Sequence, residues 1–126
     1  MSTRAAFTAG QPTRCSGVYV MHWETARLVV FVPRRWLGSR PVPCEVVPAA
    51  HGQPRDPLEF LGEPLPQDWR HHPGLRFDVT VDVTPLEQGR FGHGGLLRWR
   101  LRVDEWVSVS RQAQRPPREY GRQSPP

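Results

Sequence analysis

A chain of 126 residues is long enough for one small domain but not for a full core and a large substrate cavity together. All of its 17 basic residues are arginine, which excludes lysine nucleophiles and Schiff-base chemistry. The net charge of +5 resides in the two ends of the chain, because residues 15–110 contain arginine and acidic residues in equal number.

The two ends of the chain differ in composition from the middle. Residues 1–14 lack the apolar segment of a secretory signal, so we expect a flexible arm and a cytoplasmic protein, with an envelope location only if the start is misassigned. Residues 111–126 are rich in arginine and proline and predict a disordered tail. Lysine, isoleucine and asparagine are absent throughout, which indicates a GC-rich bacterium or its phage.

The first strand region covers residues 16–33, where a long apolar run is interrupted at Glu24–Ala26. This pattern predicts either one bent strand or two strands joined by a tight turn. A short strand is expected around residue 46. The segment DPLEFLG predicts one short helix, with Asp56 as its N-cap and Gly62 as its end.

Two later segments alternate apolar and polar side chains with the period of a half-buried strand. They are residues 77–84, with the sequence FDVTVDVT, and residues 97–104, with the sequence LRWRLRVD. Glu105 breaks the second alternation, which predicts a β-bulge near Asp104 and Glu105. Short curved strands with one helix predict an all-β protein, a small OB-like barrel over residues 15–110.

The glycine-rich stretch GRFGHGG lies between these two strands. We expect residues Pro85–Gly95 to form a long hairpin loop, because phosphate-binding glycines open a helix and these precede a strand. His93 is expected to be a structural partner of Glu24. A zinc or hydrolase site formed by His93, His22 and Glu24 is a competing hypothesis. No metal or other cofactor is expected.

Ten positions follow a pattern of glycine, tyrosine, an aromatic–glutamate pair, phenylalanine near proline, and a glycine–aromatic–glycine–histidine loop. They are Gly17, Tyr19, Trp23, Glu24, Phe31, Pro33, Gly89, Phe91, Gly92 and His93. In these positions the sequence resembles a group of small bacterial barrel proteins, many of which look like exported lipoproteins. The resemblance implies an OB-like barrel and no particular chemistry. The chain departs from that group because it shows no signal peptide.

The candidate surface for a nucleic acid or a protein partner is basic and aromatic. Its members are Arg34, Arg35, Trp36, Arg98, Arg100, Arg102 and Trp106. Arginines beside aromatic rings on a barrel are typical of single-stranded nucleic-acid binding. The alternative is ion pairing across a hairpin, which would neutralise the row. In that arrangement Asp82 lies near Arg98 or Arg100, and Asp78 lies near Arg102.

The motifs of common enzyme classes are missing from the chain. There is no Walker, G-x-S-x-G, H-E-x-x-H or C-x-x-C pattern, and neither Cys15 nor Cys44 has the context of a nucleophile. We therefore expect a non-catalytic binding module whose partner is a protein. Single-stranded nucleic acid is the alternative partner, and a cryptic metal or hydrolase site is the third hypothesis.

Overall fold

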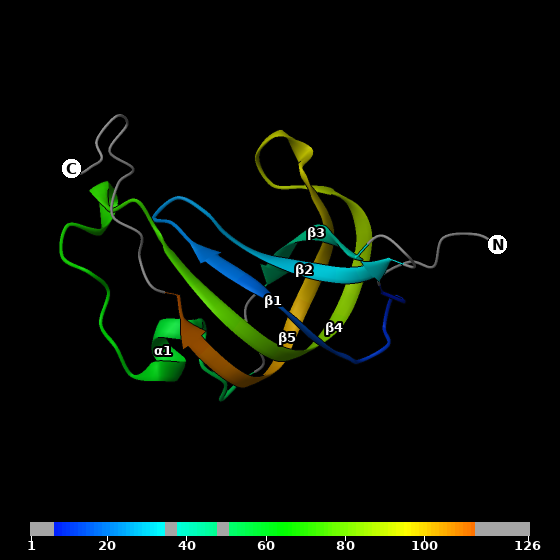
Figure 1. Ribbon diagram of the computed structural model, residues 1–126, viewed down its shortest axis with the longest axis horizontal. Coiled ribbons are helices and arrows are strands. Elements are labelled where there is room, and N and C mark those ends of the chain that lie inside the picture. Colours follow the sequence, from blue (N-terminus) through cyan, green and yellow to red (C-terminus); the bar gives the residue numbers. More distant parts are fainter. Residues whose placement is uncertain (1–6, 35–37, 48–50, 113–126) are drawn as a thin grey trace, which may run out of the picture.

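The computed structural model describes residues 7–34, 38–47 and 51–112, with the backbone alone at residues 32–34, 38, 39 and 93. Five strands close into a barrel in the order β1-β2-β3-β5-β4, with β4 returning to β1 (Figure 1). The strands are β1 (Thr13–Met21), β2 (Ala26–Arg34), β3 (Gly38–Val47), β4 (Leu75–Phe91) and β5 (Leu97–Arg111), joined by helix α1 (Pro57–Leu61) and the 3₁₀ turns η1 (Trp69–His71) and η2 (His93–Gly95). The predicted small all-β barrel is confirmed.

The barrel begins earlier and ends later than the predicted domain boundaries. Phe7, which lies in the predicted flexible arm, is buried in the core. Beyond the end of β5, Gln112 donates its backbone N–H to the carbonyl oxygen of Arg76 at 2.9 Å. Residues 1–6 of the predicted arm (1–14) and residues 113–126 of the predicted tail (111–126) lie outside the described residues.

The interruption at Glu24–Ala26 is a tight turn between two separate strands. His22 and Thr25 exchange both of their backbone hydrogen bonds across it, at 2.8 and 3.1 Å. Further along this hairpin, Gly17 lets the backbones of β1 and β2 approach closely. A Cβ atom at Gly17 would lie 2.1 Å from the carbonyl oxygen of Val29, so no larger residue fits there without moving the strands.

Helix α1 follows the chemistry that its sequence predicts. The Asp56 side chain accepts a hydrogen bond from the N–H of Glu59 at 2.9 Å, and Gly62 ends the helix in the left-handed conformation, with φ of 72°. Leu58 is buried, so α1 covers one end of the barrel (Figure 1). Before the helix, β3 is a strand of 10 residues and not the short strand expected around residue 46. No helix in the described ranges is long and apolar enough to cross a membrane.

The prediction of a long hairpin loop over Pro85–Gly95 is wrong for residues 85–91, because β4 continues through Phe91. Bulges within this extension take up the residues that have no partner, and pairing with β5 continues as far as Phe91, which lies opposite Leu97. The connection shrinks to η2 with Gly92 and Leu96 on either side. The tip of the hairpin, at residues 92–96, therefore lies several residues beyond Thr84, where the alternating pattern ends.

A bulge in β5 fixes the register of the same hairpin nearer its base. Asp82 and Val83 of β4 pair with Glu105 and Val103 of β5, so Asp104 has no partner on β4. This is the bulge predicted near Asp104 and Glu105, and it is confirmed.

The ion pairs expected across this hairpin are wrong. They were pairs of Asp82 with Arg98 or Arg100 and of Asp78 with Arg102. Asp82 instead lies opposite Glu105 and Asp78 opposite Ser110, because the extension of β4 moves the whole pairing along β5. Asp82 forms its ion pair with Arg14 of β1, at 2.8 Å, and that contact lowers the pKa of the Asp82 carboxyl.

The inward faces of the five strands meet in one core. Its largest fully buried side chains include Phe77, Leu28 and Leu101. Tyr19 and Trp106 pack edge-to-face near the helix end of the barrel, with ring centroids 5.5 Å apart. Phe7 packs edge-on against Trp99, at 5.6 Å, towards the other end. The core is therefore closed by aromatic pairs on both sides of the aliphatic layers.

We expect Gly17→Ala to lower the free energy of unfolding by about 1–3 kcal/mol, because the added methyl group overlaps the Val29 carbonyl and forces β1 and β2 apart. Ser16→Ala is the matched control. It removes only an exposed hydroxyl contact to Thr80 and should cost about 1 kcal/mol or less. Urea unfolding measures both variants, and equal losses would contradict the steric explanation.

Candidate functional site

A groove lies between β3 and the tip of the β4–β5 hairpin. Parallel pairing of β3 with β5 begins only where Cys44 meets Trp99, and before that point the two parts of the barrel diverge. The resulting hollow has a volume of about 580 Å³. Its described lining residues are Arg40, Pro41, Val42, Pro43, Gln88, Gly89, Leu96, Arg98 and Trp99.

The groove presents apolar surface between two cationic side chains. Leu96 is 71% exposed, which makes it the most exposed large apolar side chain in the described chain. Pro41 is exposed and Pro43 half-buried, while Trp99 closes the floor. Arg40 and Arg98 are both exposed, and neither forms an ion pair within the described residues.

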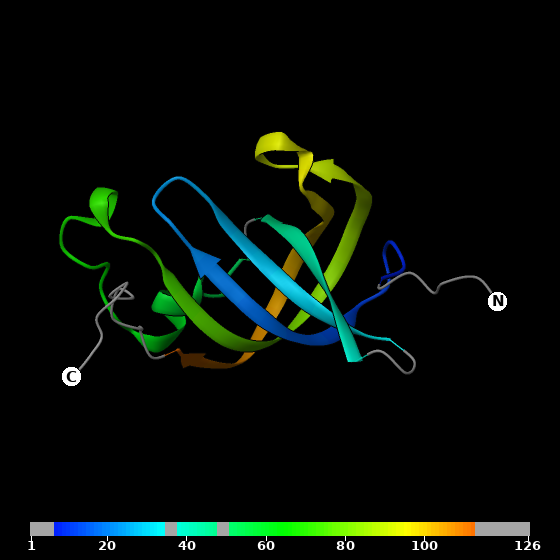
Figure 2. The same ribbon diagram turned by 45° about the horizontal axis from the view of Figure 1, so that its top comes forward.

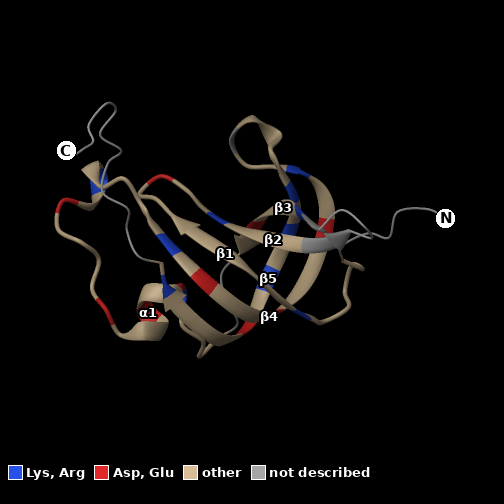
Figure 3. Ribbon diagram, in the orientation of Figure 1, with Lys and Arg blue, Asp and Glu red and all other residues tan. Residues whose placement is uncertain are grey.

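Arginines recur along β5, as predicted (Figure 3). Two of the three are neutralised by ion pairs. Arg100 pairs with Glu45 at 2.8 Å and with Glu87 at 3.7 Å. Arg102 pairs with Asp104 at 3.0 Å. Ion pairing was the predicted alternative to a phosphate-binding surface, and it occurs here with other acidic partners. Of the three arginines only Arg98, in the groove, is left without a carboxylate in the described chain.

The other members of the predicted basic and aromatic surface do not extend this row. Trp106 is buried, with 3% of its surface exposed, and its indole Nε1 donates to the carbonyl oxygen of Pro54 at 2.7 Å. It belongs to the core and not to a binding surface, because its position after the bulge turns it inward. Arg34 ends β2 without a described side chain, and Arg35 and Trp36 lie outside the described residues.

The glycines of the hairpin tip have specific steric roles. Gly92 adopts a left-handed φ of 76°, and a Cβ there would lie 2.8 Å from Cδ1 of Leu97. At Gly89 a Cβ would lie 3.0 Å from Cζ of Phe91. The Phe91 ring is half-buried and carries the Arg100 guanidinium 4.3 Å above its centroid. The tip is thus an ordered wall of the groove.

Glu24 and His93 belong to two projections that are separate in both Figure 1 and Figure 2. Glu24 is exposed in the β1–β2 turn, where its backbone N–H donates to Nδ1 of His22 at 3.3 Å. The side chain of His93 lies outside the described residues, so its partnership with Glu24 stays a prediction. Among the side chains that are described, no group of three or more His, Cys, Asp or Glu could hold a metal ion.

A basic and aromatic patch that no sequence motif indicates lies beside the β1–β2 turn. Arg70 of η1 stacks on Trp23 of the turn, 5.0 Å from the ring centroid. Arg27 of β2 and Arg76 of β4 flank Val20 of β1, since Val20 pairs with both. None of these three arginines forms an ion pair in the part of the chain that is described. The strand register brings Arg27 and Arg76 together, and η1 places Arg70 on Trp23.

The two cysteines are poor nucleophiles in this barrel. Burial raises the pKa of the Cys15 thiol to about 11 and that of the Cys44 thiol to about 12. The thiolate is the reactive form of cysteine, and little of it forms at neutral pH when the pKa is this high. Both residues therefore act as small apolar groups of the core, as the absence of a nucleophile motif suggested.

Comparisons with protein-family models, with curated proteins and with solved structures found no match to this chain. The groove and the patch are therefore interpreted from their own geometry and charge.

We expect Arg100→Ala to lower the free energy of unfolding by about 1–2 kcal/mol. The side chain is 35% exposed, so its ion pairs with Glu45 and Glu87 are partly screened, and the stacking on Phe91 adds a similar amount. Arg98→Ala, on the same face of β5, should change stability by less than about 0.5 kcal/mol. Urea unfolding separates the two, and a larger loss for Arg98→Ala would contradict the assigned contacts.

Proposed function

We propose that the protein is a non-catalytic binding module built on an OB-like barrel, and that the groove between β3 and the hairpin tip binds a segment of a protein partner. The observation that carries this proposal is the exposed Leu96 above an apolar groove of about 580 Å³. Exposed apolar surface rimmed by polar residues is typical of interaction sites. The five-stranded closed barrel with its helix between β3 and β4 supports the OB-like assignment.

The partner is expected to dock through side chains and not as an added strand. Pro41 and Pro43 stand two positions apart in β3 and so lie along the same edge of the strand. Proline has no backbone N–H, so in a strand it lies where no hydrogen bond to a neighbouring strand is needed. The edge of β3 that faces the groove is therefore poor in donors. Strand addition needs both donors and acceptors along an edge, so this edge disfavours it.

The charge of the groove selects for acidic segments. Arg40 and Arg98 stand on opposite walls without carboxylates from the described chain, and both are free to bind anionic side chains. An apolar side chain resting on Leu96, with aspartate or glutamate on either side of it, satisfies both features. We infer that the partner segment has this composition.

A nucleic acid fits the groove less well than a peptide. Single-stranded binding relies on exposed aromatic rings on which bases stack. The aromatic residue among the described lining of the groove is Trp99, and only 5% of its surface is exposed. The neutralised Arg100 and Arg102 also supply little charge for phosphates.

Single-stranded nucleic acid is a second candidate ligand, and the patch beside the β1–β2 turn is the observation that favours it. Trp23 is 40% exposed and stacked with Arg70, while Arg27 and Arg76 add two further cations without described carboxylate partners. Exposed aromatic surface beside arginines is the combination that single strands bind. This function uses a surface distinct from the groove, so the two can be tested separately.

A displayed library of linear peptides, selected on the full chain, tests the first function. We expect selected peptides to combine apolar residues with aspartate or glutamate. Leu96→Ser should weaken their binding about 10-fold or more, because an exposed leucine contributes about 1.5–3 kcal/mol when a partner buries it. Leu65→Ser is the matched control, since Leu65 is 53% exposed outside the groove. Basic peptides, or equal losses in both variants, would overturn the proposal.

Fluorescence anisotropy with a labelled oligothymidine tests the second function on the same full chain. Binding should weaken with salt, and Arg27→Ser and Arg76→Ser should each reduce the salt slope by about 0.7, the value for one released phosphate contact on a single strand. Leu96→Ser should leave oligonucleotide binding unchanged. Absence of binding at low salt, or binding that survives both arginine substitutions, would eliminate this second function.

A further inference from the structure

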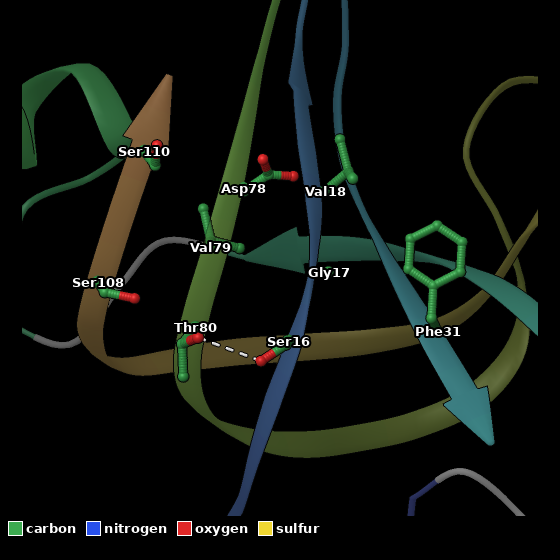
Figure 4. A pocket seen from close by; sticks show the side chains of 9 residues that line it. All are labelled: Ser16, Gly17, Val18, Phe31, Asp78, Val79, Thr80, Ser108 and Ser110. Atoms are coloured by element: carbon green, nitrogen blue, oxygen red, sulfur yellow. Dashed lines mark hydrogen bonds between the residues drawn. The ribbon is translucent and has the colours of Figure 1, made fainter. Parts of the chain in front are cut away.

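A second hollow lies on the outer surface of the barrel, away from the groove, where β1, β2, β4 and β5 meet (Figure 4). It has a volume of about 420 Å³ and opens widely to solvent. Its lining residues are Ser16, Gly17, Val18, Phe31, Asp78, Val79, Thr80, Ser108 and Ser110. Neither of the proposed binding functions uses any of them.

The hollow surrounds Gly17 of β1. Two cross-strand rows border it. Ser16, Thr80 and Ser108 are successive partners across β1, β4 and β5, and Val18, Asp78 and Ser110 form the next row. The register thus gathers four hydroxyl groups and one carboxylate around the hollow.

Hydrogen-bonding capacity in the hollow is only partly used. The hydroxyl groups of Ser16 and Thr80 bond each other at 3.1 Å. Oδ1 of Asp78 accepts from Nε2 of Gln112 at 2.9 Å, which leaves its other carboxylate oxygen available. Ser108 and Ser110 are exposed and donate no side-chain hydrogen bond within the described residues. A ligand with several hydroxyl groups could complete these bonds.

An aromatic ring borders the opposite side of the hollow. Figure 4 shows Phe31 on β2 at one side and Ser108 and Ser110 on β5 at the other, with the Asp78 carboxylate and the Thr80 hydroxyl between them. Phe31 is 45% exposed, which is unusual for a phenylalanine in a strand. Its free face offers an apolar platform next to polar groups.

We propose that this hollow binds a neutral carbohydrate, with the apolar C–H face of one sugar ring on Phe31 and sugar hydroxyl groups on Asp78 and the serines. The lining contains Asp78 and no basic residue, so it disfavours nucleic acid and other anions. At the centre of the hollow β4 is paired on both edges, so a peptide strand cannot join the sheet there. An entirely apolar ligand would leave the hydroxyl groups without partners.

The experiment is a titration of the ¹⁵N-labelled full chain with cellotriose and chitotriose as neutral probes and a sulfated heparin disaccharide as the anionic probe. We expect amide shifts at Gly17, Thr80 and Ser108 with at least one neutral probe, with a dissociation constant on the order of 1 mM because the hollow is open. The heparin disaccharide should leave these amides unchanged, since Asp78 repels its sulfates.

Two substitutions and one control locate the binding. Phe31→Ala and Asp78→Asn should each weaken the neutral probe at least 5-fold while the rest of the spectrum keeps its dispersion. Phe60→Ala is the matched control, because Phe60 is 37% exposed on α1 and outside the hollow, and it should bind as the parent does. Absence of shifts with both neutral probes, preference for the sulfated sugar, or unchanged binding in Phe31→Ala would each overturn the proposal.

Discussion

The rest of this barrel depends on the pairing of β4 with two neighbours at once. Its first half bonds to β1, and nearly its whole length bonds to β5. Successive side chains of a strand point to opposite faces of the sheet. A slip of the register by one residue would therefore turn the buried side chains of β4 outward. Bulges in both β4 and β5 absorb the irregular residues and hold the inward faces in place. The same pairing decides which acid meets which arginine and how far the hairpin tip projects past β3.

Features encoded by neighbouring residues could be predicted from the sequence. The alternation in 77–84 and 97–104 indicates two half-buried strands, the break at Glu105 indicates the bulge, and Asp56 with Gly62 delimits α1. The register across the hairpin could not be predicted, because residues after Pro85 lose the alternation although they remain paired. Proline and glycine there are typical of loops, and only the partner strand keeps them extended.

The candidate sites were harder to predict than the fold, because they arise where distant segments meet. The groove joins Arg40 of β3 to Leu96 and Arg98, and no local pattern links these positions. Trp106 is predicted on the surface as an aromatic neighbour of the β5 arginines, but it follows the bulge at Asp104 and is buried in the core. Pro41 and Pro43 were the available signal, since alternating prolines in a strand mark an edge without a hydrogen-bonded neighbour.

These two prolines also bear on how copies of the protein behave at high concentration. Where β3 diverges from β5 the barrel has a short unpaired seam, and such seams are the usual starting points for edge-to-edge association. Pro41 and Pro43 leave that seam with carbonyl oxygens but few N–H groups, so a second copy cannot extend the sheet across it. The splayed end of the barrel can therefore stay open without becoming a template for aggregation.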